Sequence, residues 1–528
     1  MKAPPTGGDW DPALRWRGLA VVCAAMVVSA VDMTIVNVAL PDISRDLDAT
    51  LGELQWVLDG FLVALAGTLA VASGIADRFG RRRVFLAGMA AFAVASVLCA
   101  AAPSPGALIA ARVLMGVAVA FVLPPALSLL TVMFEPGERP RALGIWTVAA
   151  GLAMALGPVL GGALIAAVGW PGVFLVNVPV AAVAIPAGLA LLPESRRPDA
   201  PALDVAGAAL SVVALGGLVF FLVEGAHEGW GDPAVVAALA AGLAGAVAVV
   251  ARELRADEPL LDVRVLVRPR VAGGVVALLA LYASFLGVMF LVPQYLQYVQ
   301  ERTALAAGVA MFPVGLGVGL GPALRAVPAL ARLGARASIA GGLAVAAVGC
   351  LALMPFGDDT PLPLVGVAML VYGAAFGFAI IPATATILND LPPAKAGDGS
   401  AANQLARQVG GALGIATVGS LSAAIYASEV GDRLDGFGEA VREAARSSIG
   451  HAEDAAARLG PEGAAALLAA GDAAFDAGAR AGLALAAAGL AAAAVFVAWA
   501  LRGGPATDAV GAEGAGAGGE PAPLDAAV

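Results

Sequence analysis

Apolar stretches long enough to cross a membrane recur along almost the whole chain, separated by short polar or Gly/Pro-rich breaks. A membrane-spanning helix needs about 20 mostly apolar residues. Fourteen stretches meet that length, at 17–40, 54–74, 84–102, 106–127, 143–166, 173–192, 204–223, 234–251, 271–293, 304–324, 337–355, 361–382, 403–425 and 480–501. The pattern predicts an all-α polytopic membrane protein with fourteen transmembrane helices.

Composition agrees with that prediction. Hydrophobic residues make up 60% of the chain and charged residues 13%, whereas soluble domains average about 45–50% and about 25%. Cys23, Cys99 and Cys350 lie in separate stretches without metal-ligand or redox spacing, and His227 and His451 fall in loops. We therefore expect no disulfide, no metal site and no cofactor.

Lysine and arginine are unevenly divided between alternate loops. They cluster before residue 18 and at 78–83, 139–141, 196–197, 252–270 and 325–336, whereas the short loops between those clusters hold only Arg45 and Arg302. The positive-inside rule assigns the basic loops to the cytoplasm. We expect a multi-pass protein of the cell (inner, plasma) membrane with both termini cytoplasmic. The net charge of −10 comes largely from acids in the other loops, so no nucleic-acid partner is expected.

Three ionisable residues inside the apolar stretches are candidates for proton coupling: Asp32, Asp59 and Arg112. Such a residue costs about 2.5–3.5 kcal/mol at the centre of a span, so it must be paired, hydrated or functional. Structural alternatives remain, because Asp32 could lie near the headgroups and Arg112 could hold a backbone carbonyl. The functional interpretation is that Asp32 takes up a proton outside and releases it inside, while Arg112 controls its protonation.

The loop after the second stretch combines one acid with arginines around a glycine: Asp77, Arg78, Gly80, Arg81 and Arg82. A purely electrostatic anchor would need neither Asp77 nor Gly80. We interpret the run as a tight turn whose acid pairs with arginines in one conformation only, which makes it a conformational gate.

The fifth stretch carries closely spaced small residues and a proline: Gly157, Pro158, Gly161 and Gly162. Small residues four apart allow helices to approach closely, and proline opens the helix backbone. Close packing alone would explain them, but a bend that moves during transport needs the same residues, so they are candidates for conformational gating.

Uncharged polar and aromatic positions in several stretches are assigned to the substrate cavity. They are Asn37, Gln55, Trp56, Gln294, Gln297, Asn403 and Gln404.

The chain is divided by these patterns into five parts. Residues 1–16 form a cytoplasmic N-terminus, 17–192 a six-helix bundle, 193–270 two additional central helices with flanking loops, 271–502 a second six-helix bundle, and 503–528 a disordered cytoplasmic tail. Within the second bundle, 426–479 is predicted to be a long external loop, either a cap or, the simpler interpretation, a solvated spacer with short surface helices. Residues 331–336 are a degenerate repeat of the 77–82 run. The repeat indicates two related halves, with a substrate site between them.

Four of these segments resemble motifs of the major facilitator superfamily, and of its fourteen-span drug:proton antiporter branch, the EmrB/QacA type. Residues 32–41 are similar to the first-span motif of that branch, and 77–82 to the second-loop motif. Leu108, Arg112, Gly116 and Ala120 match the fourth-span motif linked to proton coupling, and 157–162 resemble the antiporter motif of the fifth span.

Three substitutions depart from those motifs: Ser73 and Ala153 stand where the family has glycine, and Met115 where it commonly has glutamine. The resemblance covers nearly all of residues 15–502. It implies the major facilitator fold, with two six-helix halves plus two additional central helices. It further implies proton-coupled efflux of lipophilic drugs or antibiotics by alternating access. The expected partners are a lipophilic small molecule, protons and membrane lipid, and a monomer is expected.

Two other functions remain open at this point. A proton-coupled importer of a small metabolite would share the fold, although the Gly157–Pro158 motif is one that importers tend to lack. A membrane-embedded transferase would need clustered catalytic acids or histidines at one membrane face, and the sequence has none. It also lacks a Gly-Lys-Ser/Thr phosphate loop, so neither enzymatic activity nor ATP drive is expected.

Overall fold

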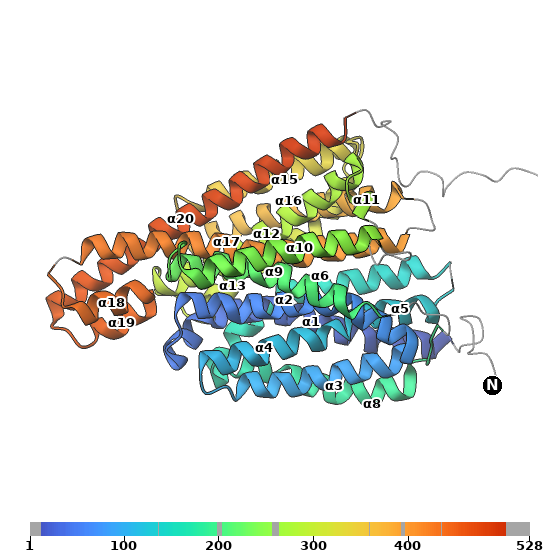
Figure 1. Ribbon diagram of the computed structural model, residues 1–528, viewed down its shortest axis with the longest axis horizontal. Helices are drawn as coiled ribbons and strands as arrows, with labels where there is room; N and C mark the ends of the chain where they lie inside the picture. Colours follow the sequence, from blue (N-terminus) through green and yellow to red (C-terminus); the bar gives the residue numbers. More distant parts are fainter. Residues whose placement is uncertain are drawn as a thin grey trace, which may run out of the picture.

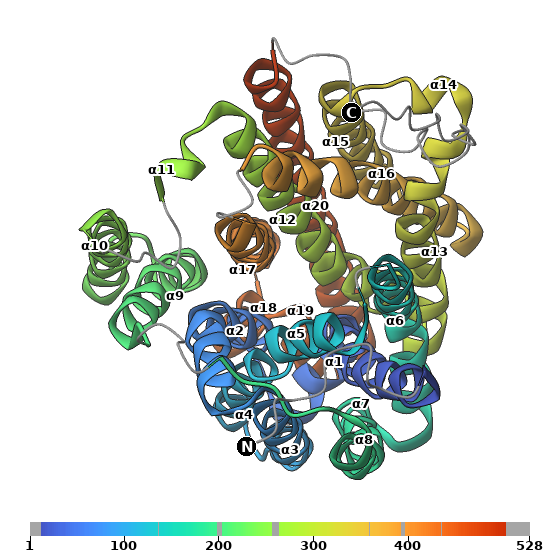
Figure 2. The same ribbon diagram turned by 90° about the vertical axis from the view of Figure 1, so that its right-hand side faces the viewer.

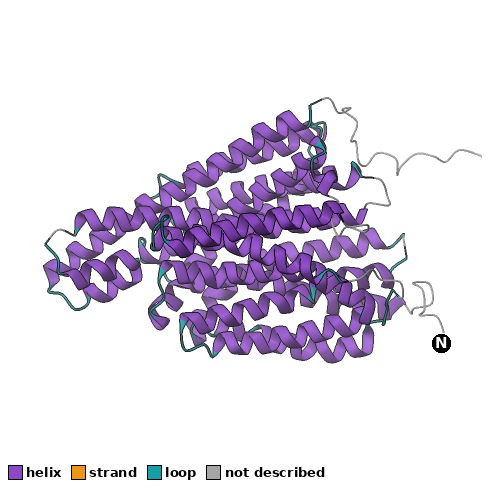
Figure 3. Cartoon of the chain, viewed as in Figure 1, coloured by secondary structure: helices purple, strands orange, loops and turns teal. Residues whose placement is uncertain are grey.

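The computed structural model describes residues 12–135, 137–197, 203–255, 263–357, 359–391, 396–434 and 436–502. All regular secondary structure in these ranges is helical (Figure 3). The helices are α1 (Pro12–Leu47), α2 (Leu51–Phe79), α3 (Arg81–Ala100), α4 (Pro105–Ala120), α5 (Leu123–Met133), α6 (Arg139–Val168), α7 (Gly172–Leu175), α8 (Asn177–Leu191), α9 (Val205–His227), α10 (Pro233–Arg255), α11 (Val263–Leu266), α12 (Pro269–Tyr298), α13 (Ala304–Ala323), η2 (Leu324–Ala326), α14 (Pro328–Ala331), α15 (Ala335–Leu353), α16 (Leu362–Asn389), α17 (Ala396–Arg433), α18 (Glu439–Ser447), α19 (Ile449–Ala456) and α20 (Pro461–Ala500).

Fourteen spans in the described ranges are long and apolar enough to cross a membrane, which confirms the predicted all-α polytopic fold. The fourth span is interrupted between α4 and α5, where Pro124 and Pro125 open the second segment. Proline lacks a backbone N–H and therefore breaks the ladder of helix hydrogen bonds. The long helices run side by side in one bundle (Figure 1).

Seen along the bundle, the helices form two groups, α1–α8 and α12–α17 with α20 (Figure 2). The additional pair, α9 and α10, lies at the periphery; α9 packs on α2, α17 and α10. The first residues of α1 and the last of α20 lie at the same end of the bundle, which we name the terminal face (Figure 1). The exact domain boundaries remain a prediction, and the tail at 503–528 lies outside the described residues.

The opposite end carries a packed helical cap where a long loop was expected. α17 continues to Arg433 and α20 begins at Pro461, so much of the expected loop at 426–479 is helical. We name residues 426–479 the cap. The cap lies at the left of Figure 1. It has its own apolar core, in which Tyr426, Leu467 and Phe475 are buried with several alanines. The interpretation as a solvated spacer is therefore wrong, because these side chains bury one another instead of facing water.

Candidate functional site

Asp32 and Arg112 form an ion pair in the interior of the first helix group. Arg112 Nη1 lies 2.6 Å from Asp32 Oδ2, and the two side chains are 1% and 0% exposed. The same guanidinium donates through Nε to the Val57 carbonyl at 2.9 Å. Arg112 thus binds both a backbone carbonyl and the acid, while its control of the protonation of Asp32 stays a prediction. A buried pair is retained only where both charges are well bonded.

Polar and aromatic side chains complete the surroundings of this pair. Asn177 Nδ2 donates to Asp32 Oδ1 at 3.4 Å and to Ser96 Oγ at 3.2 Å. The guanidinium lies over the ring of Phe61, 4.4 Å from its centroid, and donates to the sulfur of Met115 at 3.3 Å. These contacts hold both charges in fixed positions. Sequence analysis missed Asn177 and Ser96, because single polar residues within apolar stretches gave no pattern that would have connected them to Asp32.

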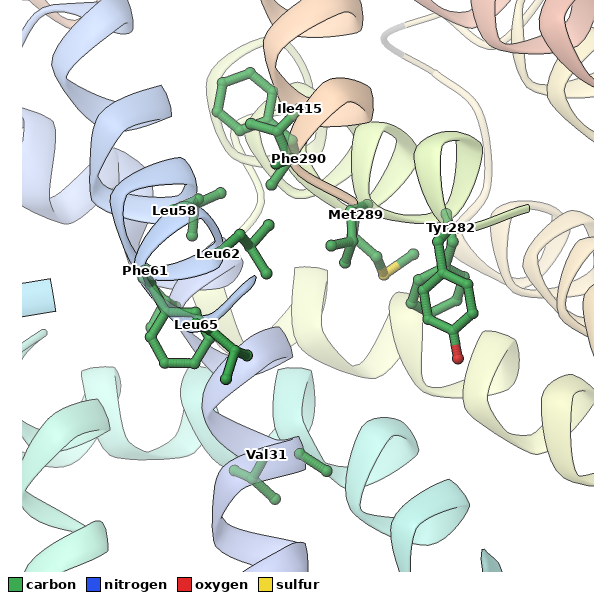
Figure 4. Packing of buried hydrophobic residues seen from close by; sticks show 14 of the residues in the cluster. Val31, Leu58, Phe61, Leu62, Leu65, Tyr282, Met289, Phe290 and Ile415 are labelled. Carbon is green, nitrogen blue, oxygen red and sulfur yellow. The ribbon is translucent and has the colours of Figure 1, made fainter. Parts of the chain in front are cut away.

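Beside the ion pair lies a small cavity shared by both helix groups. It is narrow, with a volume of about 10 Å³, which is room for about one water molecule. Its lining residues are Met33, Asn37, Leu58, Phe61, Leu62 and Arg112 from the first group, and Leu286 and Ile415 from the second. Figure 4 shows Leu58, Phe61 and Leu62 of α2 across from Ile415 and the side chains of α12. The lining is apolar apart from Asn37 and Arg112, and the cavity would have to widen before it could hold a drug-sized molecule.

Of the seven residues assigned to a substrate cavity, Asn37 is among the residues that line this one. Gln55 and Gln297 instead connect the two helix groups. Gln55 Oε1 accepts a hydrogen bond from Ser420 at 3.3 Å, and Gln297 Nε2 donates to the Val38 carbonyl at 2.9 Å.

The other four of those residues bond elsewhere. Trp56 Nε1 donates to Glu224 at 2.7 Å, and Gln294 Nε2 to the Phe290 carbonyl at 2.7 Å. Asn403 donates to Thr384 at 3.0 Å, and Gln404 accepts from Arg407 at 3.5 Å. These four are therefore engaged in packing within and between helices in this conformation.

Asp59 is completely buried in α2, and neither carboxyl oxygen has a hydrogen-bond partner among the described residues. Helix spacing places it on the α2 face between Gln55, which touches Gly419 of α17, and Val63, which touches Gly216 of α9. It does not contact the Asp32–Arg112 pair through any hydrogen bond. Buried polar groups left without partners cost free energy, and in natural proteins they often mark functional positions.

We expect Asp59→Leu to stabilise the folded protein while impairing transport. An unsatisfied buried polar group costs about 1–3 kcal/mol, which an apolar side chain of similar size avoids. Thermal unfolding in detergent would measure the stability, and dye efflux the activity. A variant that is both more stable and fully active would show that Asp59 takes no part in transport.

The glycines of the fifth span place α6 between α1 and α13. A Cβ at Gly161 would lie 3.0 Å from the Ile35 carbonyl of α1, and one at Gly162 2.5 Å from the Ala304 carbonyl of α13. Gly157 faces Thr34, and the Pro158 carbonyl faces Gly308. Close approach thus requires glycine on both sides of this helix.

Contact between α6 and α13 ends before the terminal face. A Cβ on Gly151, on Gly144 or on Gly319 of α13 would meet nothing within 4 Å. The two helix groups therefore touch along the cap end of this seam and separate toward the terminal face.

The run at 77–82 is held by hydrogen bonds and close contacts with the segment that follows α8. Asp77 Oδ1 accepts from Arg81 Nε at 2.8 Å, and the Asp77 carbonyl accepts from the Arg197 backbone at 2.8 Å. Gly80 has φ 115°, and a Cβ there would lie 2.6 Å from a carboxyl oxygen of Glu194. Positive φ favours glycine, which explains that residue in the turn. Glu194 also accepts from the Arg82 backbone at 3.2 Å. Arg78, the remaining residue of the run, is exposed.

At the opposite end the cap reaches from the second helix group onto the first. Arg45 Nε of α1 donates to Glu453 of α19 at 3.1 Å, and His451 Nε2 lies 3.5 Å from Asp48 Oδ1. Burial raises the pKa of Glu453, although Arg45 beside it acts in the opposite direction. Sequence analysis gave no indication of these contacts.

Comparison with known proteins places this arrangement in a family. Residues 22–415 match the model of the Major Facilitator Superfamily. The puromycin resistance protein pur8 of Streptomyces alboniger is 38% identical over 80% of this chain and 84% of its own length. The multidrug efflux pump LfrA of Mycolicibacterium smegmatis is 33% identical over 88% of this chain and 92% of its own.

A solved structure shares the fold. The crystal structure of a bacterial homolog of the human lysosomal transporter Spinster superposes with a TM-score of 0.63 at 18% identity, covering 93% of this chain and 98% of its own. Because the family model matches residues 22–415 and these relatives are matched over 84% and 92% of their lengths, the chain belongs to the Major Facilitator Superfamily.

Proposed function

We propose that the protein exports lipophilic drugs or antibiotics across the cytoplasmic membrane in exchange for protons, by alternating access. The observation that carries this proposal is the buried Asp32–Arg112 pair at the edge of a cavity lined by both helix groups. A substrate bound where that cavity widens would lie next to the carboxylate proposed to take up the proton, so binding and protonation would influence each other. The efflux and resistance functions of the relatives support export over import.

In the proposed cycle the terminal face is cytoplasmic, as the arginine-rich loops at that face favour. The conformation with α6 and α13 in contact at the cap end would then be open to the cytoplasm. Substrate would enter the cavity there, and the helix groups would rock until the cap end opens. That step would break Arg45–Glu453 and Gln297–Val38, both of which bridge the two groups.

Protonation is proposed to reset the transporter. In the outward-open state Asp32 would take a proton, which would weaken its attraction to Arg112, and it would release that proton after the cavity reopens inward. One proton supplies about 2.3 kcal/mol at 100 mV and about 1.4 kcal/mol per pH unit. Together these support roughly a few hundred-fold gradient of a neutral substrate.

The loop at 77–83 and the glycines of α6 are proposed as gating elements. The Asp77–Arg81 pair and the Glu194 contacts lie at the terminal face, where the helix groups are separate, and closure of that face would rearrange them. A monomer suffices for this mechanism, because the ion pair, the cavity and the gating contacts all lie within one chain.

The proposal is tested by expressing the chain in an exporter-deficient bacterium and measuring puromycin susceptibility and ethidium accumulation. We expect lower susceptibility and lower accumulation than with empty vector, because efflux would be driven by the proton gradient. A protonophore should remove the difference in accumulation.

The same assay separates the alternatives. Higher accumulation of test compounds in expressing cells would indicate import, and accumulation that stays low with protonophore present would exclude proton drive.

A further inference from the structure

The additional helix α9 brings a carboxyl group close to buried Asp59. Trp56 Nε1 of α2 donates to Glu224 Oε1 of α9 at 2.7 Å, and the Trp56 ring lies 6.0 Å from that of Phe220. The functions proposed for the ion pair, the cavity and the seam leave this contact without a role. Glutamate within a span is costly and usually faces a protein interior or water.

Three contacts fix how α9 lies along α2. A Cβ on Gly52 would lie 3.0 Å from the His227 ring, Glu224 bonds Trp56, and a Cβ on Gly216 would lie 3.5 Å from Val63. The two helices therefore run antiparallel, and moving from the cap end inward one meets His227, then Glu224, then the level of Asp59. Trp56 and Asp59 are three residues apart, a rise of about 4.5 Å.

Burial changes sharply between the two carboxyl groups. Glu224 is half-buried and its helix neighbours toward the cap end, His227 and Glu228, are exposed. Asp59 is 0% exposed, and the buried residues Val219 and Val223 of α9 lie at neighbouring levels. Glu224 is thus the carboxyl group of α9 that lies between the exposed residues at the cap end and the unpartnered Asp59.

We propose that Glu224 is a proton relay between the water at the cap end and Asp59, so that the additional helix pair supplies part of the proton path. The inference rests on the proposed proton-coupled function. A proton from water binds the Glu224 carboxylate. The Glu224 side chain then rotates away from Trp56 and carries the proton toward Asp59, one helical turn further along α2. Asp59 first releases its own proton toward the terminal face while that face is open, and then accepts the incoming one. Glu224 returns to the carboxylate form bonded to Trp56.

Other titratable groups on α9 and α2 also lie near Glu224. On α9 these are His227, whose Nδ1 lies 2.9 Å from the Val223 carbonyl, and exposed Glu228. On α2, Glu53 is engaged in the capping box with Thr50. Glu224 alone among them touches the turn of α2 that precedes Asp59.

Two substitutions separate a proton relay from a structural tie. Glu224→Gln retains an oxygen that accepts the Trp56 hydrogen bond but removes the group that carries a proton. Trp56→Phe removes the hydrogen bond but retains the carboxyl group and an aromatic ring. Glu228→Gln, at an exposed position one turn further, is the matched control.

The measurement is ethidium-induced proton release from inverted membrane vesicles with an acidic lumen, followed with a pH-sensitive dye over a range of lumenal pH. We expect Glu224→Gln to slow proton release about tenfold or more, as loss of a proton-transfer group does, with a changed pH profile. Trp56→Phe and Glu228→Gln should stay within about twofold of wild type, and Glu224→Asp should restore part of the rate.

Other outcomes would overturn the proposal. A Glu224→Gln rate and pH profile equal to wild type would exclude the relay, and a loss in Trp56→Phe alone would assign Glu224 a structural role. Wild-type vesicles that release no protons with ethidium or puromycin would contradict the proposed proton-coupled function itself, a result distinct from either of these.

Discussion

Replacing Asp32 with asparagine is expected to abolish proton-driven efflux, with a rate at least about a hundredfold lower than wild type. The carboxylate is the acceptor for Arg112 at 2.6 Å and the group proposed to take up the proton. Asparagine can neither titrate nor neutralise the guanidinium. Dye efflux and drug susceptibility at equal membrane expression measure the effect. Asp359→Asn, an exposed acid in the loop before α16, is the control and should behave as wild type.

Loss of folding could imitate loss of coupling, and a double variant separates the two. Removing one partner of a buried pair costs about 3–5 kcal/mol, because the other charge is left uncompensated. Asp32→Asn with Arg112→Met removes both charges, so we expect membrane expression and thermal stability to recover while efflux stays absent. If the double variant regains protonophore-sensitive efflux, the proton is carried elsewhere, and Asp59 is the first candidate.

Sequence alone predicted the spans and flagged both members of the ion pair. Asp32 and Arg112 are conspicuous because charges inside apolar stretches are costly. Their contact could not be derived, since it joins positions 80 residues apart through the packing of α1 against its neighbours. Asn177 escaped notice for the same reason, because its importance comes from Asp32 and Ser96, which are distant in sequence.

The polar residues assigned to a cavity show a second limit. Asn37 and Gln294 both bond carbonyls four residues earlier in their own helices. An amide satisfied by its own helix can face a cavity or a packed interface, and the sequence pattern does not distinguish the two. The packing of the two helix groups decides the matter: of these two residues, Asn37 lines the cavity between the groups and Gln294 does not.

The packed helices of the cap could not be predicted from its composition. Seven of the 15 buried residues in its core are alanines, and three of the larger side chains come from two helices, Tyr426 from α17 and Leu467 and Phe475 from α20. Alanine carries little hydrophobic signal of its own, so the segment resembled a solvated loop until its helices were seen packed together.

α6 and α13 pack closely at the cap end, and a side chain between them should impair transport. Gly308→Val is expected to reduce efflux roughly tenfold or more. A side chain at Gly308 would overlap the Pro158 carbonyl, so the cap end could not close as observed. Overpacking costs about 1–3 kcal/mol, which corresponds to roughly a 5- to 150-fold shift away from this conformation. Gly319→Val on the same helix is the matched control, because a Cβ there meets nothing within 4 Å.

Labelling distinguishes a blocked gate from a damaged fold. In a background without Cys23, Cys99 and Cys350, Asn37→Cys places a thiol at the cavity beside the ion pair. A membrane-impermeant maleimide added outside intact cells should label it faster in Gly308→Val than in the parent, because the cap end stays open. Unchanged labelling with normal efflux would show that α6 and α13 need not touch during transport. Slower efflux without faster labelling would mean that the valine hinders a different step, since a seam held apart must expose the cavity on the cap side.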